Sequence, residues 1–244
     1  MTDALTARQT QILKAIIDEY IQTAEPVGSE ALEKKYNLGI SPATIRNEMV
    51  DLTRIDYLRQ PHTSAGRVPT PKAMKFYIDQ LMEEKQMSVA EEVKVKEDVF
   101  EKRQDVDELL NEATNALASV TRSLAVAALD EEEKLWHAGY ANIFVNPEFT
   151  DIRATASLFS CLEEFQMMHE LFFERMTGLS PVEVIFGEEL GWPGFGPIGV
   201  VGTRFDLAGK HGALGIIGPT RLPYYRIIPV VRYFRDLIEE VAQR

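Results

Sequence analysis

The thirty residues from 41 to 70 join a short helix directly to a turn-rich hairpin, and this pairing constrains the fold more than any other stretch. Ser41 is a helix-capping residue type, and Pro42 suits the first helical position, where no N–H is needed. Apolar side chains then recur at helical spacing and predict one buried stripe. The stripe consists of Ile45, Met49, Leu52 and Ile55.

The opposite face of this predicted helix is polar and carries Thr44, Arg46, Asn47 and Arg54, of which the first three are the candidates for base readout. Arginine binds guanine with two hydrogen bonds, asparagine binds adenine in the same way, and a threonine methyl group can contact thymine. A solvated polar face would explain the same residues on an isolated helix. The capped start and the hairpin that follows favour base recognition in the major groove.

The hairpin begins with a short strand at residues 57–60, turns through residues 61–66 and returns at Arg67 and Val68. A helix followed by such a hairpin is typical of a winged helix-turn-helix, in which the wing lies along the DNA backbone or the minor groove. Gly66 would let the backbone at Arg67 approach the groove closely. The predicted wing and phosphate contacts are Ser41, Arg59, His62, Thr63, Ser64, Arg67, Lys72 and Lys75.

Two further helices are predicted before this stretch, over residues 5–23 and 29–36, so residues 1–80 have the elements of one DNA-binding module. The distribution of charge along the chain also sets this module apart from the rest. The whole chain has a formal charge of −12, but residues 1–80 are neutral, residues 81–140 carry −8 and residues 141–244 carry −4. A neutral module can still present a local basic surface to phosphates, while an acidic remainder discourages non-specific binding to DNA.

Three segments of the module have the sequences LTARQTQILKAIIDEYIQTAEPVGSEAL, SPATIRNEMVDL and QPHTSAGRVPT. They resemble the N-terminal domain of the HrcA family, bacterial heat-inducible transcription repressors. Later segments resemble the family's C-terminal half, which has a GAF-like fold: NPEFTDI, VIFGEEL, IGVVG and LGIIGPTRLPYYRI. The resemblance implies a homodimer that represses chaperone operons at an inverted-repeat operator in double-stranded DNA, with the chaperonin GroEL helping to keep it active.

The resemblance also implies a shortened member of the family, because only Leu135 separates SLAVAALDEEEK from WHAGYANIF. Most of the family's inserted dimerising subdomain would be absent there. We therefore expect an α+β protein with a winged helix-turn-helix at residues 1–80, a helical linker or dimer helix at 81–130 and a GAF-like α+β domain at 131–244. Within residues 131–244, we expect a helix over 151–174, strands near 181–186, 198–203 and 213–217, and a final helix over 222–243.

Residues 91–129 contain no proline or glycine and predict one long helix. Apolar residues recur along it at alternating spacings of four and three. That pattern, which covers fewer than three heptads, fits either a dimer helix or a helix packed on its own domain. The residues are Val106, Leu110, Ala113, Leu117, Val120 and Leu124.

The sequence contains no convincing motif for catalysis or for metal binding, so we expect no enzyme, no cofactor and no metal. Residues 194–199 spell G-x-G-x-x-G, but a proline lies inside the motif and a strand is expected where a helix should begin. The four histidines are scattered without partner cysteines. The single cysteine, Cys161, and the absence of a signal peptide or an apolar membrane span predict a cytoplasmic protein.

Two other functions remain open from the sequence. One is a regulator whose GAF-like domain binds a small effector in a pocket lined by residues 198–203 and 213–217. The other is a scaffold whose winged helix contacts proteins, in keeping with the acidic charge.

Overall fold

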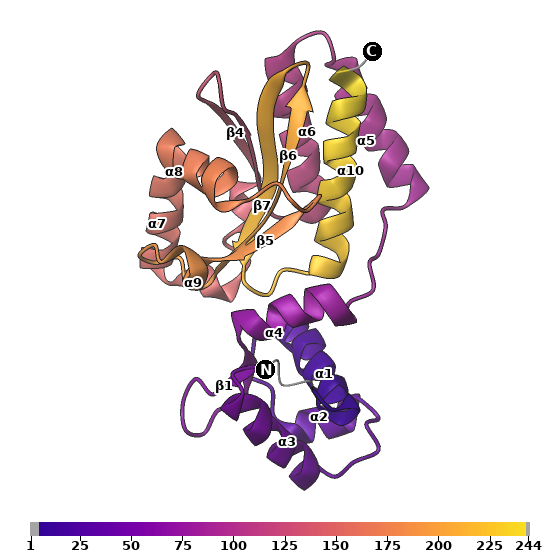
Figure 1. Ribbon diagram of the computed structural model, residues 1–244, viewed down its shortest axis with the longest axis vertical. Helices are drawn as coiled ribbons and strands as arrows, with labels where there is room; N and C mark the ends of the chain where they lie inside the picture. The colour runs from indigo at the N-terminus through magenta and orange to yellow at the C-terminus, as the bar shows by residue number, and fades with distance from the viewer. Residues whose placement is uncertain (1–4, 243–244) are drawn as a thin grey trace. The chain divides into compact units, whose positions relative to one another are not determined.

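The computed structural model describes residues 5–242 and divides them into two units, with the boundary between Glu83 and Glu84. Figure 1 traces the chain through both. The second unit includes residues 84–130 of the predicted helical linker. Of the two helices formed there, one packs on the sheet of that unit and the other packs against the first.

The first unit has three helices followed by a two-stranded hairpin, as the sequence predicts for a winged helix-turn-helix. Thr6 and Gln9 cap the first helix reciprocally through side chain and backbone, which satisfies two N–H groups at its start. A fourth helix leaves the hairpin and continues into a π-helical turn over Tyr77–Leu81. The elements are α1 (Ala7–Thr23), α2 (Ser29–Lys35), α3 (Pro42–Arg54), β1 (Leu58–Arg59), β2 (Val68–Pro69) and α4 (Pro71–Phe76).

The predicted apolar stripe of α3 forms part of the core of this unit. Ile45 and Leu52 are fully buried and Met49 is nearly so. Ile55 lies beyond the last helical residue and is only half-buried, because α3 ends at Arg54. Burial of this stripe fixes the opposite face of α3 toward solvent.

The second unit is built on a five-stranded sheet in which every neighbouring pair of strands is antiparallel, in the order β4-β3-β7-β6-β5. The predicted hairpin near residues 198–217 is confirmed, with strands longer than expected. The strands are β3 (Leu124–Leu129), β4 (Lys134–Ala138), β5 (Glu183–Phe186), β6 (Ile198–Leu207) and β7 (Lys210–Pro219).

Helices cover both faces of this sheet (Figure 1). Helices α6 and α10 pack on one face, with α5 against α6, and the segment from α7 to η4 packs on the other. The last helix, predicted over residues 222–243, is confirmed as α10. The helices are α5 (Val89–Glu101), α6 (Val106–Thr121), α7 (Ile152–Glu163), α8 (Phe165–His169), η4 (Glu170–Arg175), α9 (Gly187–Leu190) and α10 (Tyr224–Ala242).

The single helix predicted over residues 91–129 is wrong. The segment forms α5, a turn, α6 and then β3, whose six residues are all buried because both faces of the sheet are covered. A strand buried on both faces has no alternating pattern and resembles a buried helix in sequence. The predicted heptad pattern is therefore divided between two elements. Leu124 lies in β3, whereas Leu110, Ala113 and Leu117 lie on α6 and are buried within the unit.

Two other expectations need correction. Strand β4, which begins at the short turn where the resemblance places the shortened middle, was not predicted. The helix expected over residues 151–174 is interrupted near Glu164 and continues as α8 and the π-helical η4.

At one point on the face of β6 and β7, where the sequence left an effector pocket open, side chains fill the space. Gly202 and Gly215 lie opposite each other on the two strands. A Cβ atom at Gly202 would lie 2.7 Å from the Met176 side chain, and one at Gly215 would lie 2.8 Å from the Phe172 ring. Both of these large side chains are buried, so they occupy the space next to the glycines.

Candidate nucleic-acid interface

The start of α3 is fixed by Ser41 and Thr44. The Ser41 hydroxyl accepts a hydrogen bond of 3.2 Å from the Thr44 backbone N–H, and the two hydroxyls lie 3.0 Å apart. This N-cap satisfies one of the free N–H groups at the helix start. Ser41 is exposed and Thr44 is half-buried, so the cap also defines where the exposed face of α3 begins.

Arg46 and Asn47 lie on that exposed face, on the side away from buried Ile45. Neither side chain has a hydrogen bond or an ion pair with another of residues 5–242. Arg54 differs, because it forms an ion pair of 2.9 Å with Asp51 on its own helix. The arginine and asparagine of this face are therefore available to a ligand without breaking an internal bond.

The wing is a hairpin with two paired positions, Leu58 with Pro69 and Arg59 with Val68. Its turn is held from inside by Gln60, whose side-chain amide donates hydrogen bonds of 2.9 Å to the carbonyls of Thr63 and Ala65. The polar side chains of the turn are exposed, as is that of Arg59. They are His62, Thr63 and Ser64.

The base of the wing is joined to the connection between α1 and α2. Val27 and Arg67 exchange two backbone hydrogen bonds, of 2.8 and 2.9 Å. A Cβ atom at Gly66 would lie 2.4 Å from the Val27 carbonyl oxygen, so no other residue fits without a backbone shift. Gly66 thus allows a close approach between two protein segments, a role that the sequence did not indicate, while the predicted approach of the Arg67 backbone to the groove stays a prediction.

Arg67 lies between the wing and α3. Its Nε donates a hydrogen bond of 3.1 Å to the Thr53 hydroxyl, and the residue is half-buried. A hollow of about 380 Å³ opens between α3 and the turn of the wing, and Gly28 and Ser29 complete its wall. The predicted contact residues that line it are Arg46, Thr63, Ser64 and Arg67.

The two predicted lysine contacts lie on α4. The Lys72 ammonium donates to the Ile55 carbonyl at 2.8 Å and lies 4.5 Å from the centre of the Tyr57 ring, so it closes the C-terminal end of α3. Lys75 is exposed one turn later. Lys72 therefore has a structural role beside its predicted one.

Sequence reasoning missed three residues that position the interface: Val27, Thr53 and Gln60. Val27 and Thr53 act through partners distant in the chain, which no local pattern reveals. Gln60 gave a weak signal, since a polar amide directly after a strand and before a turn of Pro, Thr, Ser and Gly can satisfy the carbonyls of that turn.

Among residues 5–242 no group of three or more His, Cys, Asp and Glu side chains is placed to hold a metal ion. The G-x-G-x-x-G motif leads into β6, so no helix N-terminus follows it. Cys161 is buried, and burial raises the pKa of its thiol to about 12, which keeps it protonated and unreactive. Over the same part of the chain, the helices are too short or too polar to span a bilayer.

Comparison with known proteins matches both units to one family. Residues 4–83 match the model of the winged helix-turn-helix transcription repressor, HrcA DNA-binding, and residues 69–228 match the model of the HrcA protein C-terminal domain. The heat-inducible transcription repressor HrcA of Halalkalibacterium halodurans is 27% identical over 335 aligned positions, which cover 96% of each chain. With 244 residues, this chain lacks many residues that its relative has.

A second relative supports the same family, and a solved structure shares the fold. The heat-inducible transcription repressor HrcA of Acetivibrio thermocellus is 45% identical over 129 residues, which are 53% of this chain and 37% of the relative. A hypothetical protein with a crystal structure at 2.2 Å resolution shares the fold over 98% of both chains, with a TM-score of 0.75 and 18% identity. Since the two family models together extend from residue 4 to residue 228, the chain belongs to the HrcA family.

Proposed function

We propose that this chain represses heat-shock genes by binding an operator in duplex DNA through its first unit. Two kinds of observation support this: the curated relatives are named heat-inducible transcription repressors, and the first unit matches a DNA-binding family model. Repression follows from occupancy, because an operator covered by the protein is closed to RNA polymerase. The protein would act in the cytoplasm, where bacterial DNA lies.

In this proposal, α3 enters the major groove and presents Arg46 and Asn47 to the base edges, with Thr44 beside them. The exposure of Arg46 and Asn47 and their lack of internal partners support this assignment. Arg46 would bind guanine and Asn47 adenine, each with two hydrogen bonds.

One observation supports the proposal more than the others: the hollow between α3 and the wing is lined by two arginines and three hydroxyl side chains. Arginine forks and hydroxyl groups are the ligands that phosphate oxygens prefer. We infer that a DNA backbone follows this hollow while α3 lies in the groove beside it. Ser41, Arg59, His62, Lys72 and Lys75 would contact flanking phosphates.

A homodimer would place two copies of α3 in successive major grooves of an inverted repeat, since a two-fold protein requires a two-fold operator. The family resemblance adds the chaperonin GroEL as a partner that helps to keep the repressor active.

Selection of bound duplexes from random DNA, using the purified full chain, tests the proposal. We expect one enriched half-site repeated with inverted symmetry. Affinity for it should fall by orders of magnitude between about 50 and 200 mM salt, as several phosphate contacts require. Equal binding to all duplexes at every salt concentration would contradict sequence-specific repression.

A further inference from the structure

A second hollow, of about 650 Å³, lies in the second unit between the edge strand β4 and the C-terminal half of α7. Three aromatic side chains contribute to its wall: Tyr140, Phe159 and Phe165. The ring centres of Tyr140 and Phe159 are 5.9 Å apart, with the rings tilted by 54°. Because β4 is an edge strand, no further strand of residues 5–242 covers this side.

Two carboxylates, Glu133 and Glu163, also line this hollow. Neither side chain forms a hydrogen bond or an ion pair within the part of the chain that the structure describes. Burial raises the pKa of the Tyr140 phenol, and the negative charge of Glu163 raises it further. The carboxylate thus makes the potential at the aromatic wall negative.

Among residues 5–242, no lysine or arginine forms an ion pair with either of these carboxylates. None of the side chains that line the hollow is a lysine or an arginine. The neighbouring Lys134 is already held by Asp107 at 2.9 Å and by Glu132 at 2.8 Å. His137 lines the hollow, but burial lowers the pKa of its imidazole, so the ring is neutral near pH 7 and its Nδ1 lies 2.7 Å from the Tyr140 hydroxyl.

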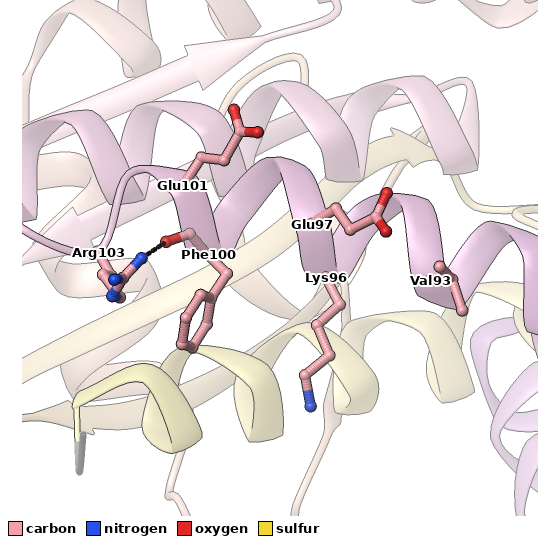
Figure 2. Close-up of a pocket in the computed structure, with 6 residues that line it drawn as sticks. All are labelled: Val93, Lys96, Glu97, Phe100, Glu101 and Arg103. Carbon is pink, nitrogen blue, oxygen red and sulfur yellow. Dashed lines mark hydrogen bonds between the residues drawn. The ribbon is translucent and has the colours of Figure 1, made fainter.

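A hollow on α5, lined by Val93, Phe100 and Arg103 among others, provides a contrast (Figure 2). There the Arg103 guanidinium carbon lies 4.5 Å from the centre of the Phe100 ring, so the protein supplies its own cation. Lys96 of the same hollow pairs with Glu240 at 2.8 Å. The hollow beside β4 has aromatic rings and carboxylates without such an internal cation.

We propose that the hollow beside β4 binds a small organic cation of the alkylammonium or quaternary ammonium class. The rings of Tyr140 and Phe159 would contact the cation with their faces, and Glu163 would supply the opposite charge. Aromatic walls with a nearby anion are the recurring way in which proteins bind such cations, whose diffuse charge loses little hydration. This site is independent of the DNA-binding surface.

The test compares choline with its neutral isostere 3,3-dimethyl-1-butanol, using ligand-observed saturation-transfer NMR on the full chain at constant ionic strength. We expect saturable binding of choline that is at least about threefold tighter than binding of the alcohol. Equal binding of the two probes, or no saturable binding of choline, would overturn the proposal.

Variants locate the site. Glu163→Gln removes an exposed charge without touching the core, and we expect at least about threefold weaker choline binding with unchanged thermal unfolding. Phe159→Leu should have a similar effect on binding. Glu97→Gln, in the hollow of Figure 2, is the matched control and should leave choline binding unchanged.

Two outcomes count against the assignment. Equal losses in Glu163→Gln and Glu97→Gln would mean that choline responds only to the overall negative charge. Tighter binding of N-acetyl-arginine amide than of choline, with the same loss in Glu163→Gln, would show that the hollow receives a protein side chain and not a free cation.

Discussion

The Nε of Arg67 donates a hydrogen bond of 3.1 Å to the hydroxyl of Thr53, and this bond joins the wing to the helix α3. Thr53 itself donates to the Met49 carbonyl at 2.7 Å, which fixes the orientation of its hydroxyl. The position of the wing relative to α3 therefore depends on a residue that need not contact DNA.

Thr53→Val keeps the shape of the side chain but removes the acceptor for Arg67. We expect operator affinity to fall about fivefold, the effect of losing one ordinary hydrogen bond of about 1 kcal/mol, with little change in thermal stability. Electrophoretic mobility shift with the selected operator measures this. Thr53→Ser should restore affinity; if it binds as weakly as Thr53→Val, the hydroxyl is not the cause.

Arg46→Ala and Asn47→Ala remove the proposed base contacts. Each should reduce discrimination between the operator and a scrambled duplex by about 1–3 kcal/mol, because a bidentate contact is lost. Both side chains are exposed and without internal partners, so the free energy of unfolding should not change. Arg54→Ala, at the end of the same helix, is the control and should preserve discrimination.

Gly66→Ala should destabilise the first unit. The added methyl group would lie 2.4 Å from the Val27 carbonyl oxygen, and the backbone has to move to admit it. We expect a loss of about 1–3 kcal/mol, as for other overpacked sites, seen as a lower midpoint in chemical denaturation. The neighbouring Gly28→Ala is the matched control, because a Cβ atom there meets nothing within 4 Å.

Phe172→Ala should open the space next to Gly202 and Gly215. Removing a fully buried aromatic ring costs about 3–5 kcal/mol in the free energy of unfolding, while Phe144→Ala, at a position that is 61% exposed, should cost far less. Differential scanning calorimetry compares the two. Similar losses would mean that Phe172 does not pack as described.

The ion pair between Glu84 and Arg232 makes stability depend on pH. Hydrogen bonds of 2.8 Å from Arg232 lower the pKa of the Glu84 carboxyl below its usual 4.5. A lowered pKa in the folded state stabilises the fold above pH 4.5, and this contribution is lost as the pH falls through the folded value.

Glu84→Gln should therefore unfold more easily than the native chain at pH 7, by no more than about 1 kcal/mol because the pair is partly exposed. The difference should shrink below pH 4.5. Urea denaturation at pH 7 and pH 4 measures it, with Glu97→Gln as a control. A difference that stays constant with pH would point to packing and not to charge.

How much the sequence could predict depended on where the partners of each element lie. The stripe of α3 is local, so its buried face and the exposure of Arg46 and Asn47 followed from periodicity alone. Strand β3 was misread as helix because its two-sided burial depends on α6 and on the segment from α7 to η4, which lie on either side of it in the chain.

The wing shows the same limit at a smaller scale. Its turn was predicted from Pro, Ser and Gly, yet the restriction at Gly66 comes from Val27, which is distant in sequence. Likewise, nothing near Arg67 indicates that its guanidinium contacts Thr53.

The hydrogen bond from Lys72 to the Ile55 carbonyl has a mechanical consequence. Helix α4 continues through its π-helical turn toward the unit boundary at Glu83, so Lys72 connects the segment that leaves the unit to the last turn of α3. A rotation of α4 would therefore either break this hydrogen bond or move the end of α3 with it. The orientation of α4 and the geometry at the end of α3 are thus linked through one side chain.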